Sequence, residues 1–545
     1  MVGHCLAVGA AVGALQARQA SERGQIFVLS YGRGTAPGLS AANVSVVTPP
    51  RLGGGLIGAL RAVQWVRGLR RVDFGDAYLA QPGLSVSRGR GPSIALPFVA
   101  GARRVRAIDP GTGGTSRTFS RRLALAEVLR FLVLAGFSLL AARTAAALLN
   151  RTDGPSTAPA RLPAGGQVLY LRTDVELAQS PLRIGGSQAH TDGILGALED
   201  RGYEVEVMTT GYVAGRAERL EARRLPALLA GNVPREMSEL AAGLVQYLQL
   251  RGGPAPALIY QRYSMNNLAG ALLSARWRVP LVLEVNGSEV KWRREWSSLQ
   301  FGALAEATER FVLRRSDRIG AVSDNVARDL GPAGAPAARV RVVPNGVEVA
   351  RFADAPPAPL PFGEGAFVVG FAGLFYPWHG VHILAEAFVL LRREHPEARL
   401  VFVGDGEERE AAARVLEGAG ATEDVLFTGL VPREAIPGYL AALDVLVSPH
   451  VPNDDFIGSP IKIWEYMAAG RAIVASDVAQ LAQALKHDDT ALIVPAGDPQ
   501  ALADALGRLH DSPALRARLG GAARAEAVAQ HSWEARLEEL LGEGG

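Results

Sequence analysis

The stretch SPIKIWEYMAAG, residues 459–470, has the sequence of a short helix with well-marked ends. Ser459 suits the N-cap, Pro460 suits the first helical position, and Gly470 can end the helix in a left-handed conformation. Lys462 falls in the first turn, where the helix dipole disfavours a cation by roughly 0.3–1 kcal/mol. A phosphate at this helix N-terminus would reverse the penalty, because free N–H groups, dipole and ammonium would all attract it. The sequence therefore predicts an anion-binding site.

Glu465 lies three residues after Lys462, so the two side chains share one face of the predicted helix. A carboxylate in that place can accept hydrogen bonds from sugar hydroxyls while the lysine binds an adjacent phosphate. A ribose next to a diphosphate matches this spacing. An ordinary surface Lys/Glu pair is the alternative interpretation, so the neighbouring motifs must decide between the two.

Short apolar runs on both sides of this helix predict a parallel β-sheet. The runs are FVVGFAG (367–373), RLVFVGDG (399–406), VLFTGLV (425–431), VLVSPH (445–450) and AIVASD (472–477). Helical stretches separate the runs, and parallel strands need such crossovers. Doubly wound sheets bind ligands beyond the carboxyl ends of their strands. The helix that follows VLVSPH is therefore expected to begin at a ligand-binding edge.

An earlier part of the chain shows the same alternation. Its apolar runs are QVLYLRTD (167–174), YEVEVMTT (203–210), ALIYQR (257–262), PLVLEVNG (280–287) and RIGAVSD (318–324). A break rich in Pro, Gly, Ser and Thr at 151–166 precedes them. We predict two Rossmann-like α/β domains, residues 161–345 and 346–545, that face a ligand-binding cleft.

Residues 1–160 are predicted to form an additional basic domain of incomplete α/β type, with strands at QIFVLSYG (25–32) and VSVVTPP (44–50). Residues 1–165 contain 20 Arg and 6 acidic residues, a net charge of +14, whereas the remainder contains 37 basic and 48 acidic residues, a net charge of −11. An anionic membrane surface, a polyanionic substrate or the acidic remainder of the chain would each suit this segment. An arginine-rich surface without a partner is the alternative.

Composition narrows the class of protein. The chain has 545 residues, of which 48% are hydrophobic and 20% charged, which is typical of a multidomain globular protein. Cys5 is the only cysteine, so an intramolecular disulfide and a cysteine-built metal site are excluded, and a cytoplasmic location is expected. The longest apolar block, Phe131–Ala142, is 12 residues long, shorter than the roughly 20 that a membrane-spanning helix needs. The opening residues lack a charged leading segment, so we expect no secretory signal.

Five motifs of the carboxy-terminal half occur in an order that resembles the nucleotide-sugar-binding half of retaining glycosyltransferases with the GT-B fold, family GT4. They are VVPNGVEVARF, GFAGLFYPWHGVHILAEAF, LVFVGDGEERE, VLFTGLVPREAIPGYLAALDVLVSP and SPIKIWEYMAAGRAIVASD. GGSQAHTDGILGALEDRGYEVEVMT is similar to the opening of that family's amino-terminal domain. The resemblance covers residues 165–540 and does not extend to residues 1–160.

The resemblance implies a donor site with named contacts. Glu465 would bind the ribose of the donor, and Lys462 with the adjacent N–H groups from Ser459 onward would bind its phosphates. Gly185 and Gly186 would form a loop that lets the backbone approach the diphosphate and the transferred sugar. An ordinary tight turn is the alternative for these two glycines. Backbone contacts to the nucleotide base are expected from Gly429, Leu430 and Val431.

Further contacts are expected around the transferred sugar and the acceptor. His190 is a candidate catalytic contact together with Lys462 and Glu465, and a buried structural histidine is the alternative. Asn286 and Glu289 follow a predicted strand and are candidate substrate contacts, or else capping and turn residues. Trp378 and His379 are further candidate contacts that could instead pack the loop that contains them.

Two departures from the family pattern stand out. Relatives often carry an Arg or Lys soon after the first strand of the carboxy-terminal domain, as one half of a diphosphate clamp. Here Leu374, Phe375 and Tyr376 occupy that region. The acidic residue often found eight positions before the equivalent of Glu465 falls on Ile457, and only a shifted loop would let Asp454 or Asp455 replace it.

The predicted function is glycosyl transfer from a nucleotide sugar to a saccharide or lipid-linked acceptor, with retention, in polysaccharide or glycoconjugate synthesis. Lys462 and backbone N–H groups would stabilise the leaving diphosphate without a metal or another cofactor. Neither NDDF nor HDDT is placed as a metal motif, and the only lysines, Lys291, Lys462 and Lys486, follow no pyridoxal-phosphate motif. A sugar-nucleotide epimerase of the same fold and a non-catalytic scaffold are the alternatives. A peripheral place on the inner membrane face is expected, and no nucleic-acid partner.

Overall fold

The computed structural model describes most of the chain from residue 162 onward and isolated elements before it. The described residues are 26–29, 44–47, 76–80, 104–108, 115–119, 122, 138–151, 162–172, 186–209, 216, 223–224, 235–296, 299–452, 461–478, 481 and 484–542. The chain folds as two compact units: residues 1–152, 226–245 and 293–308 belong to one, and residues 153–225, 246–292 and 309–545 belong to the other. No helix among the described residues is both long and apolar enough to cross a membrane.

The first unit contains a five-stranded sheet of order β2-β1-β3-β4-β5. Its strands are β1 (Ile26–Leu29), β2 (Val44–Val47), β3 (Asp76–Ala80), β4 (Arg104–Ile108) and β5 (Thr115–Phe119). Three pairings are parallel, and β5 alone pairs antiparallel, with β4. The two strands predicted in this region are thereby confirmed as β1 and β2.

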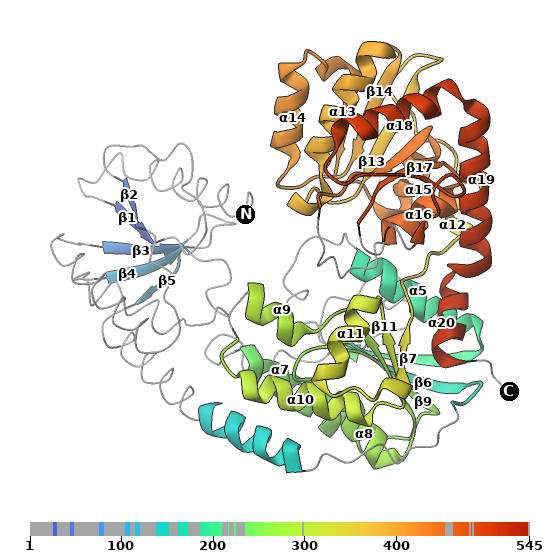
Figure 1. The fold of residues 1–545 in the computed structure, drawn as a ribbon. Helices are drawn as coiled ribbons and strands as arrows, with labels where there is room; N and C mark the ends of the chain where they lie inside the picture. The colour runs from blue at the N-terminus through green and yellow to red at the C-terminus, as the bar shows by residue number, and fades with distance from the viewer. Residues whose placement is uncertain are drawn as a thin grey trace. The chain divides into compact units, whose positions relative to one another are not determined.

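The second unit contains two parallel sheets (Figure 1). The first has the order β12-β11-β10-β9-β6-β7-β8. Its strands are β6 (Gly166–Arg172), β7 (Tyr203–Thr209), β8 (Arg223–Arg224), β9 (Leu258–Arg262), β10 (Leu281–Val285), β11 (Arg318–Ala321) and β12 (Val340–Val342). The helices along this stretch of the chain are α5 (Gly186–Asp200), α7 (Arg235–Leu250), α8 (Ala269–Trp277), α9 (Glu289–Trp296), α10 (Gly302–Arg315), α11 (Asp324–Ala333) and α12 (Ala350–Ala353). The five strands predicted for this sheet are all present.

The second sheet has the order β15-β14-β13-β16-β17-β18. Its strands are β13 (Phe367–Ala372), β14 (Ala398–Val403), β15 (Val425–Gly429), β16 (Val445–Ser448), β17 (Ala472–Ser476) and β18 (Leu492–Val494). Its helices are α13 (Val381–Glu394), α14 (Arg409–Gly418), α15 (Ile436–Ala441), α16 (Ile461–Ala469), α18 (Pro499–Asp511), α19 (Pro513–Gln530) and α20 (Trp533–Leu541). All five predicted strands are confirmed, whereas β18 was not predicted.

Both faces of this second sheet are covered by helices, which is why its strands read as continuous apolar runs. Every residue of β13 is buried, and alternate residues face opposite sides. Phe367, Val369 and Phe371 pack with α13, α14 and α18, while Val368 and Ala372 pack with α16 and α19. Because β13 lies between β14 and β16, the crossovers leave its two sides in opposite directions, and a binding site is expected at its carboxyl end.

The last helix returns to the first sheet of the second unit. Trp533, Leu537 and Leu540 of α20 are buried in one cluster with Ile194 and Leu195 of α5. Ser532 caps the helix by accepting a hydrogen bond from the Ala535 N–H. The final helix of the chain's described part therefore packs against the amino-terminal sheet. With its two doubly wound sheets, the second unit has the predicted two-domain α/β architecture.

Candidate functional site

The site is built around α16, which begins just beyond the carboxyl end of β16. Tyr466 is fully buried and anchors this helix to the end of β13, because its hydroxyl accepts from the Ala372 N–H at 2.8 Å and donates to the Ala372 carbonyl at 3.2 Å. Gly470 has φ of +68° and ends the helix as predicted. Ser459 and Pro460 lie outside the described residues, so the proposed N-cap stays a prediction.

The Lys462 ammonium reaches the loop after β13. Its Nζ atom lies 4.6 Å from the centroid of the Phe371 ring, and a Cβ added to Gly373 would come within 3.6 Å of it. Although the residue keeps partial exposure, Nζ itself is covered and has no hydrogen-bond partner among the described residues. Burial lowers the pKa of Lys462 to about 7, against the attraction of Glu465, which raises it. A covered ammonium without an oxygen partner is costly unless a ligand supplies one.

Two imidazole groups lie near this ammonium. The rings of His379 and His450 are in edge contact at 5.3 Å between centroids. Burial, followed by the nearby Lys462 charge, lowers the pKa of His379 to about 3 and that of His450 well below its usual value. Nδ1–H of His379 donates to the carbonyl of Leu374, which leaves Nε2 as an acceptor in the neutral ring. Residues 374–376 contain no Arg or Lys, so the basic residue that relatives often place there as one half of a diphosphate clamp is absent. The imidazoles of His379 and His450 lie near Lys462 instead.

Glu465 lies one helical turn from Lys462, as predicted. Burial raises the pKa of Glu465, while the charges of Arg433, Arg351 and Lys462 oppose that rise. Arg351 also donates from Nη2 to the Arg433 carbonyl at 3.0 Å, so the two guanidinium-bearing segments are joined. The three cations therefore offset part of the burial effect that disfavours the ionised carboxylate, and the carboxyl oxygens can accept hydrogen bonds from hydroxyl groups.

Arg433 connects this cluster to α5. Its Nη1 atom lies 2.7 Å from Oδ2 of Asp192, with both side chains mostly buried. Asp192 also accepts a hydrogen bond from the Arg216 N–H at 2.9 Å. The helix that begins at Gly186 therefore meets the Glu465 cluster through a charged pair. Sequence reasoning missed Arg351, Arg433 and Asp192, although Arg433 lies within the quoted motif VLFTGLVPREAIPGYLAALDVLVSP, two residues after Val431.

His190 lies in a buried polar network. Its Nδ1 atom is 2.6 Å from Oδ1 of Asn345, and its Nε2 atom is 2.6 Å from Oε1 of Glu284. Glu284 accepts further hydrogen bonds from Tyr260 at 2.9 Å and Asn286 at 2.7 Å. Although burial raises the pKa of Glu284, the charges of His190 and Arg262 and the hydrogen bonds from His190 and Asn286 lower it to about 2. With 4% exposure, His190 fits the buried structural alternative better than direct substrate contact.

The other candidates occupy several loops. Asn286 is half-buried on the Glu284 network, and Glu289 accepts a hydrogen bond from the Met265 N–H at 3.1 Å, which is a turn-stabilising role. Trp378 is 42% exposed and stacks on Tyr376 at 4.6 Å between ring centroids. These two exposed rings belong to the same loop as His379.

The remaining predicted contacts are the base-binding segment and the glycine loop. Gly429 ends β15 with φ of +70°, and Leu430 beside it is 39% exposed, so this segment is accessible for a base contact. Gly186 is the first residue of α5, whereas Gly185 lies outside the described residues, as do Ile457, Asp454 and Asp455. Their roles stay predictions.

Comparisons with known proteins identify the family. The family described as "Glycosyl transferases group 1" matches residues 366–512, and the "Glycosyl transferase 4-like domain" matches residues 185–346. The 2-deoxystreptamine N-acetyl-D-glucosaminyltransferase of Streptomyces fradiae is 31% identical over 356 residues, which is 59% of this chain and 82% of that protein. The D-inositol 3-phosphate glycosyltransferase of Nocardia farcinica is 29% identical over 419 residues, 72% of this chain and 88% of that protein.

Solved structures show the same fold. Anabaena HepE, crystallised in complex with UDP, aligns with a TM-score of 0.53 at 19% identity, over 68% of this chain and 98% of that chain. Two Rossmann-like sheets with a returning final helix define the class of GT-B proteins. The chain belongs to the group 1 glycosyltransferases, and it is a glycosyltransferase.

Proposed function

We propose that this chain transfers a sugar from a nucleoside-diphosphate donor to a saccharide or lipid-linked acceptor, as a GT4 enzyme that retains the anomeric configuration. The observation that carries the proposal is the covered Nζ of Lys462, which lacks a partner among the described residues at the carboxyl end of β13. A diphosphate oxygen would supply the missing partner and neutralise the charge.

The residues around Lys462 would then have distinct tasks. Lys462 and the first N–H groups of α16 stabilise the negative charge that develops on the leaving diphosphate. Glu465, whose ionised form is favoured by the charges of Arg433 and Arg351, accepts hydrogen bonds from the donor ribose. The Lys462 charge lowers the pKa of both His379 and His450. A bound diphosphate would offset that charge, and the two imidazoles would then become better hydrogen-bond donors. No metal or other cofactor is needed for these steps.

The names of similar proteins support the choice of donor and acceptor classes. HepE was crystallised with UDP and with UDP-glucose. The relatives named above are an N-acetyl-D-glucosaminyltransferase and a D-inositol 3-phosphate glycosyltransferase. We infer a hydroxyl-rich acceptor and a role in polysaccharide or glycoconjugate synthesis in the cytoplasm.

A ligand screen tests the donor. UDP-, GDP- and ADP-sugars are added separately while thermal unfolding is followed, because a ligand of the native state raises the melting temperature by mass action. One nucleotide class should stabilise the wild type and leave Lys462→Ala unaffected. Equal stabilisation of both proteins would place the nucleotide elsewhere.

The arginine-rich residues 1–165 are the reason to propose an anionic membrane surface as a further partner, with a peripheral location. Flotation with vesicles that contain phosphatidylserine tests this. Binding at low salt that is lost at high salt supports an electrostatic contact. Absence of binding at both salt concentrations rejects it.

A further inference from the structure

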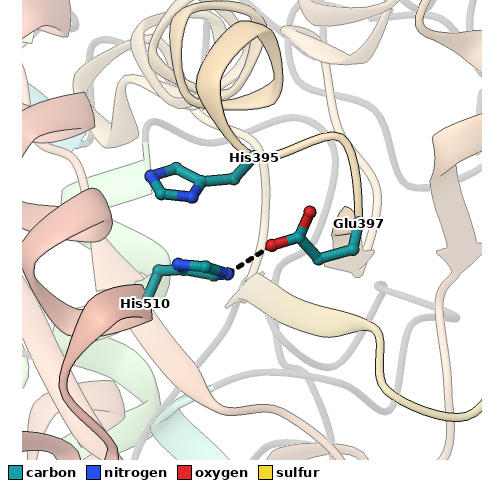
Figure 2. Close-up of side chains that lie close together, drawn as sticks. All are labelled: His395, Glu397 and His510. Atoms are coloured by element: carbon teal, nitrogen blue, oxygen red, sulfur yellow. Dashed lines mark ion pairs between the residues drawn. The ribbon is translucent and has the colours of Figure 1, made fainter.

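A second cluster of polar side chains lies at the opposite edge of the β13–β18 sheet from Lys462. His395 directly follows α13, Glu397 directly precedes β14, and His510 is the penultimate residue of α18. Figure 2 shows the three side chains converging, with one ring nitrogen of His395 turned toward the other two. Each residue offers one ligand atom, and the three atoms lie within 4.8 Å of one another.

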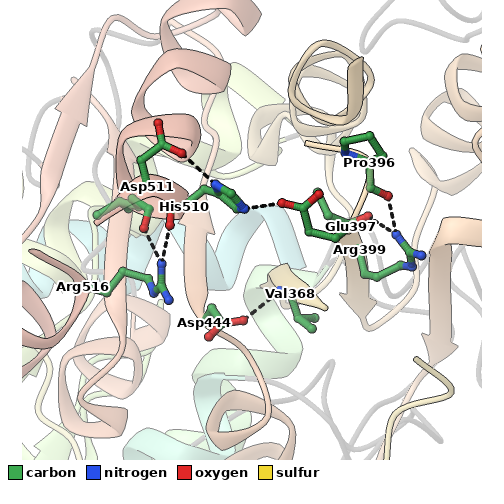
Figure 3. Close-up of polar contacts among 10 residues, drawn as sticks. Val368, Pro396, Glu397, Arg399, Asp444, His510, Asp511 and Arg516 are labelled. Atoms are coloured by element: carbon green, nitrogen blue, oxygen red, sulfur yellow. Dashed lines mark hydrogen bonds and ion pairs between the residues drawn. The ribbon is translucent and has the colours of Figure 1, made fainter. Parts of the chain in front are cut away.

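The His510 ring has a carboxylate next to each of its two nitrogens, which favours a cation at this place. Nε2 lies 2.5 Å from Oε1 of Glu397, and Nδ1 lies 2.8 Å from Oδ1 of Asp511, so the ring stands between two carboxylates (Figure 3). Carboxylate oxygens only accept hydrogen bonds, and a neutral imidazole carries a single N–H. If that N–H faces Asp511, the lone pair of Nε2 points at the Glu397 oxygen. A metal ion bound to both Nε2 and the Glu397 oxygen would give each of them a partner.

The second histidine favours the metal. The rings of His395 and His510 lie 3.9 Å apart between centroids with an angle of 41° between their planes. A metal ion takes neutral imidazoles as ligands, so one ion could bind a ring nitrogen of each histidine together with the Glu397 carboxylate. Two imidazoles and one carboxylate are donors that suit Zn²⁺ and similar divalent ions, and Asp511 would orient the His510 ring as an outer carboxylate.

The present spacing needs only a local adjustment. Ligand atoms on a tetrahedral zinc ion are about 3.3 Å apart, so the Glu397 oxygen would move away from His510 while His395 approaches. The Glu397 side chain is 44% exposed, and it can change rotamer without disturbing the core. That exposure also leaves room for water at a fourth position.

We propose that His395, Glu397 and His510 form a zinc-class binding site that joins the end of α18 to the connection between α13 and β14. The ion would hold together two packed helices and the start of a central strand, and so would stabilise the carboxy-terminal domain. The site is separate from the donor site, because it adjoins the amino ends of β13 and β14. Its existence does not depend on the proposed glycosyl transfer.

Metal analysis after dialysis of the untagged full chain against Zn²⁺ tests the proposal. We expect one site-specific ion per chain, a higher melting temperature with Zn²⁺, and a visible absorption band when Co²⁺ replaces it. Glu397→Gln should weaken binding at least tenfold while the protein stays folded, and Asp511→Asn should weaken it by roughly 10–100-fold. His510→Ala should abolish it.

Matched controls separate this site from other weak binding. Glu394→Gln changes a nearby exposed carboxylate outside the cluster, and His487→Ala removes a histidine that forms an ion pair with Asp488 away from it. Both variants should bind Zn²⁺ as the wild type does. The proposal is overturned if the wild type takes up no zinc, or if Glu397→Gln and His395→Gln retain wild-type affinity and an unchanged Co²⁺ spectrum.

Discussion

The Nζ atom of Lys462 lies 4.6 Å from the centroid of the Phe371 ring, held over an aromatic face and covered from solvent. Cation–π attraction offsets part of the cost of burying the charge, but an oxygen ligand would offset far more. The geometry therefore indicates that the Lys462 ammonium is positioned to bind a ligand. This position destabilises the protein when no ligand is bound. Both the stability of the free protein and its affinity for a nucleotide should reflect this arrangement.

Replacing Lys462 by Met should stabilise the ligand-free protein, because it removes a buried ammonium without creating a large cavity. The folded pKa of about 7 lies below the ordinary value of 10.5, so the unfolded chain binds more protons between these values and the wild type gains stability as pH rises through them. We expect the variant to gain about 1 kcal/mol or more at pH 7 and below. Urea unfolding at several pH values measures this, and a variant that is less stable at every pH would contradict it.

Nucleotide binding should take up protons above pH 7. A bound diphosphate favours the charged lysine, so the affinity of the wild type should fall by up to about tenfold per pH unit above the folded pKa of about 7. Calorimetry of UDP binding at pH 8 in buffers of different ionisation enthalpy counts the protons. Uptake approaching one per site is expected, and a heat of binding independent of the buffer would disprove it.

Removing Arg433 should shift the acid limb of the pH–activity profile to higher pH. Arg433 is the largest influence that holds down the pKa of Glu465 against burial, so Arg433→Met should raise that pKa further. We expect lower activity at neutral pH that recovers as pH rises. Asp192→Asn, which keeps Arg433, is the control and should leave the acid limb near its wild-type position. Parallel profiles for wild type and Arg433→Met would count against this role.

His190→Ala should reduce the free energy of unfolding by about 3–5 kcal/mol, because the buried Glu284 carboxylate loses the partner whose Nε2 lies 2.6 Å from its Oε1. The folded pKa of Glu284 is about 2 against an ordinary 4.5, so its contribution is complete above pH 4.5 and disappears as pH falls toward 2. Chemical unfolding of wild type and Glu284→Gln at pH 7 and pH 3 measures the contribution of the Glu284 carboxylate to stability. If the stability difference between the two proteins is no smaller at pH 3 than at pH 7, this role of the carboxylate is refuted.

Much of the fold was predictable from sequence. Buried parallel strands such as FVVGFAG read as continuous apolar runs, and the strands expected around α16 are all present. Short edge strands gave no such signal: β8 has two residues and β18 has three, too few for a period to emerge. The antiparallel β5 was also missed, since TSRTF has four polar residues and a single apolar one, so no apolar pattern marks it.

The site was predictable only where one local motif contains both partners. Lys462 and Glu465 share a helix turn, and their oddly placed charges could be read directly from the sequence. Asp192 and Arg433 are separated by 241 positions, and their ion pair depends on tertiary packing. The burial of His190 could not be read from sequence either, because its partners Glu284 and Asn345 come from other parts of the chain.

The most direct test is a crystal structure of this protein with UDP, or with whichever nucleoside diphosphate the ligand screen selects. We predict a diphosphate oxygen about 2.7–2.9 Å from Nζ of Lys462 and a ribose hydroxyl on the Glu465 carboxylate. A diphosphate bound elsewhere, with Nζ of Lys462 still lacking an oxygen partner, would contradict the account.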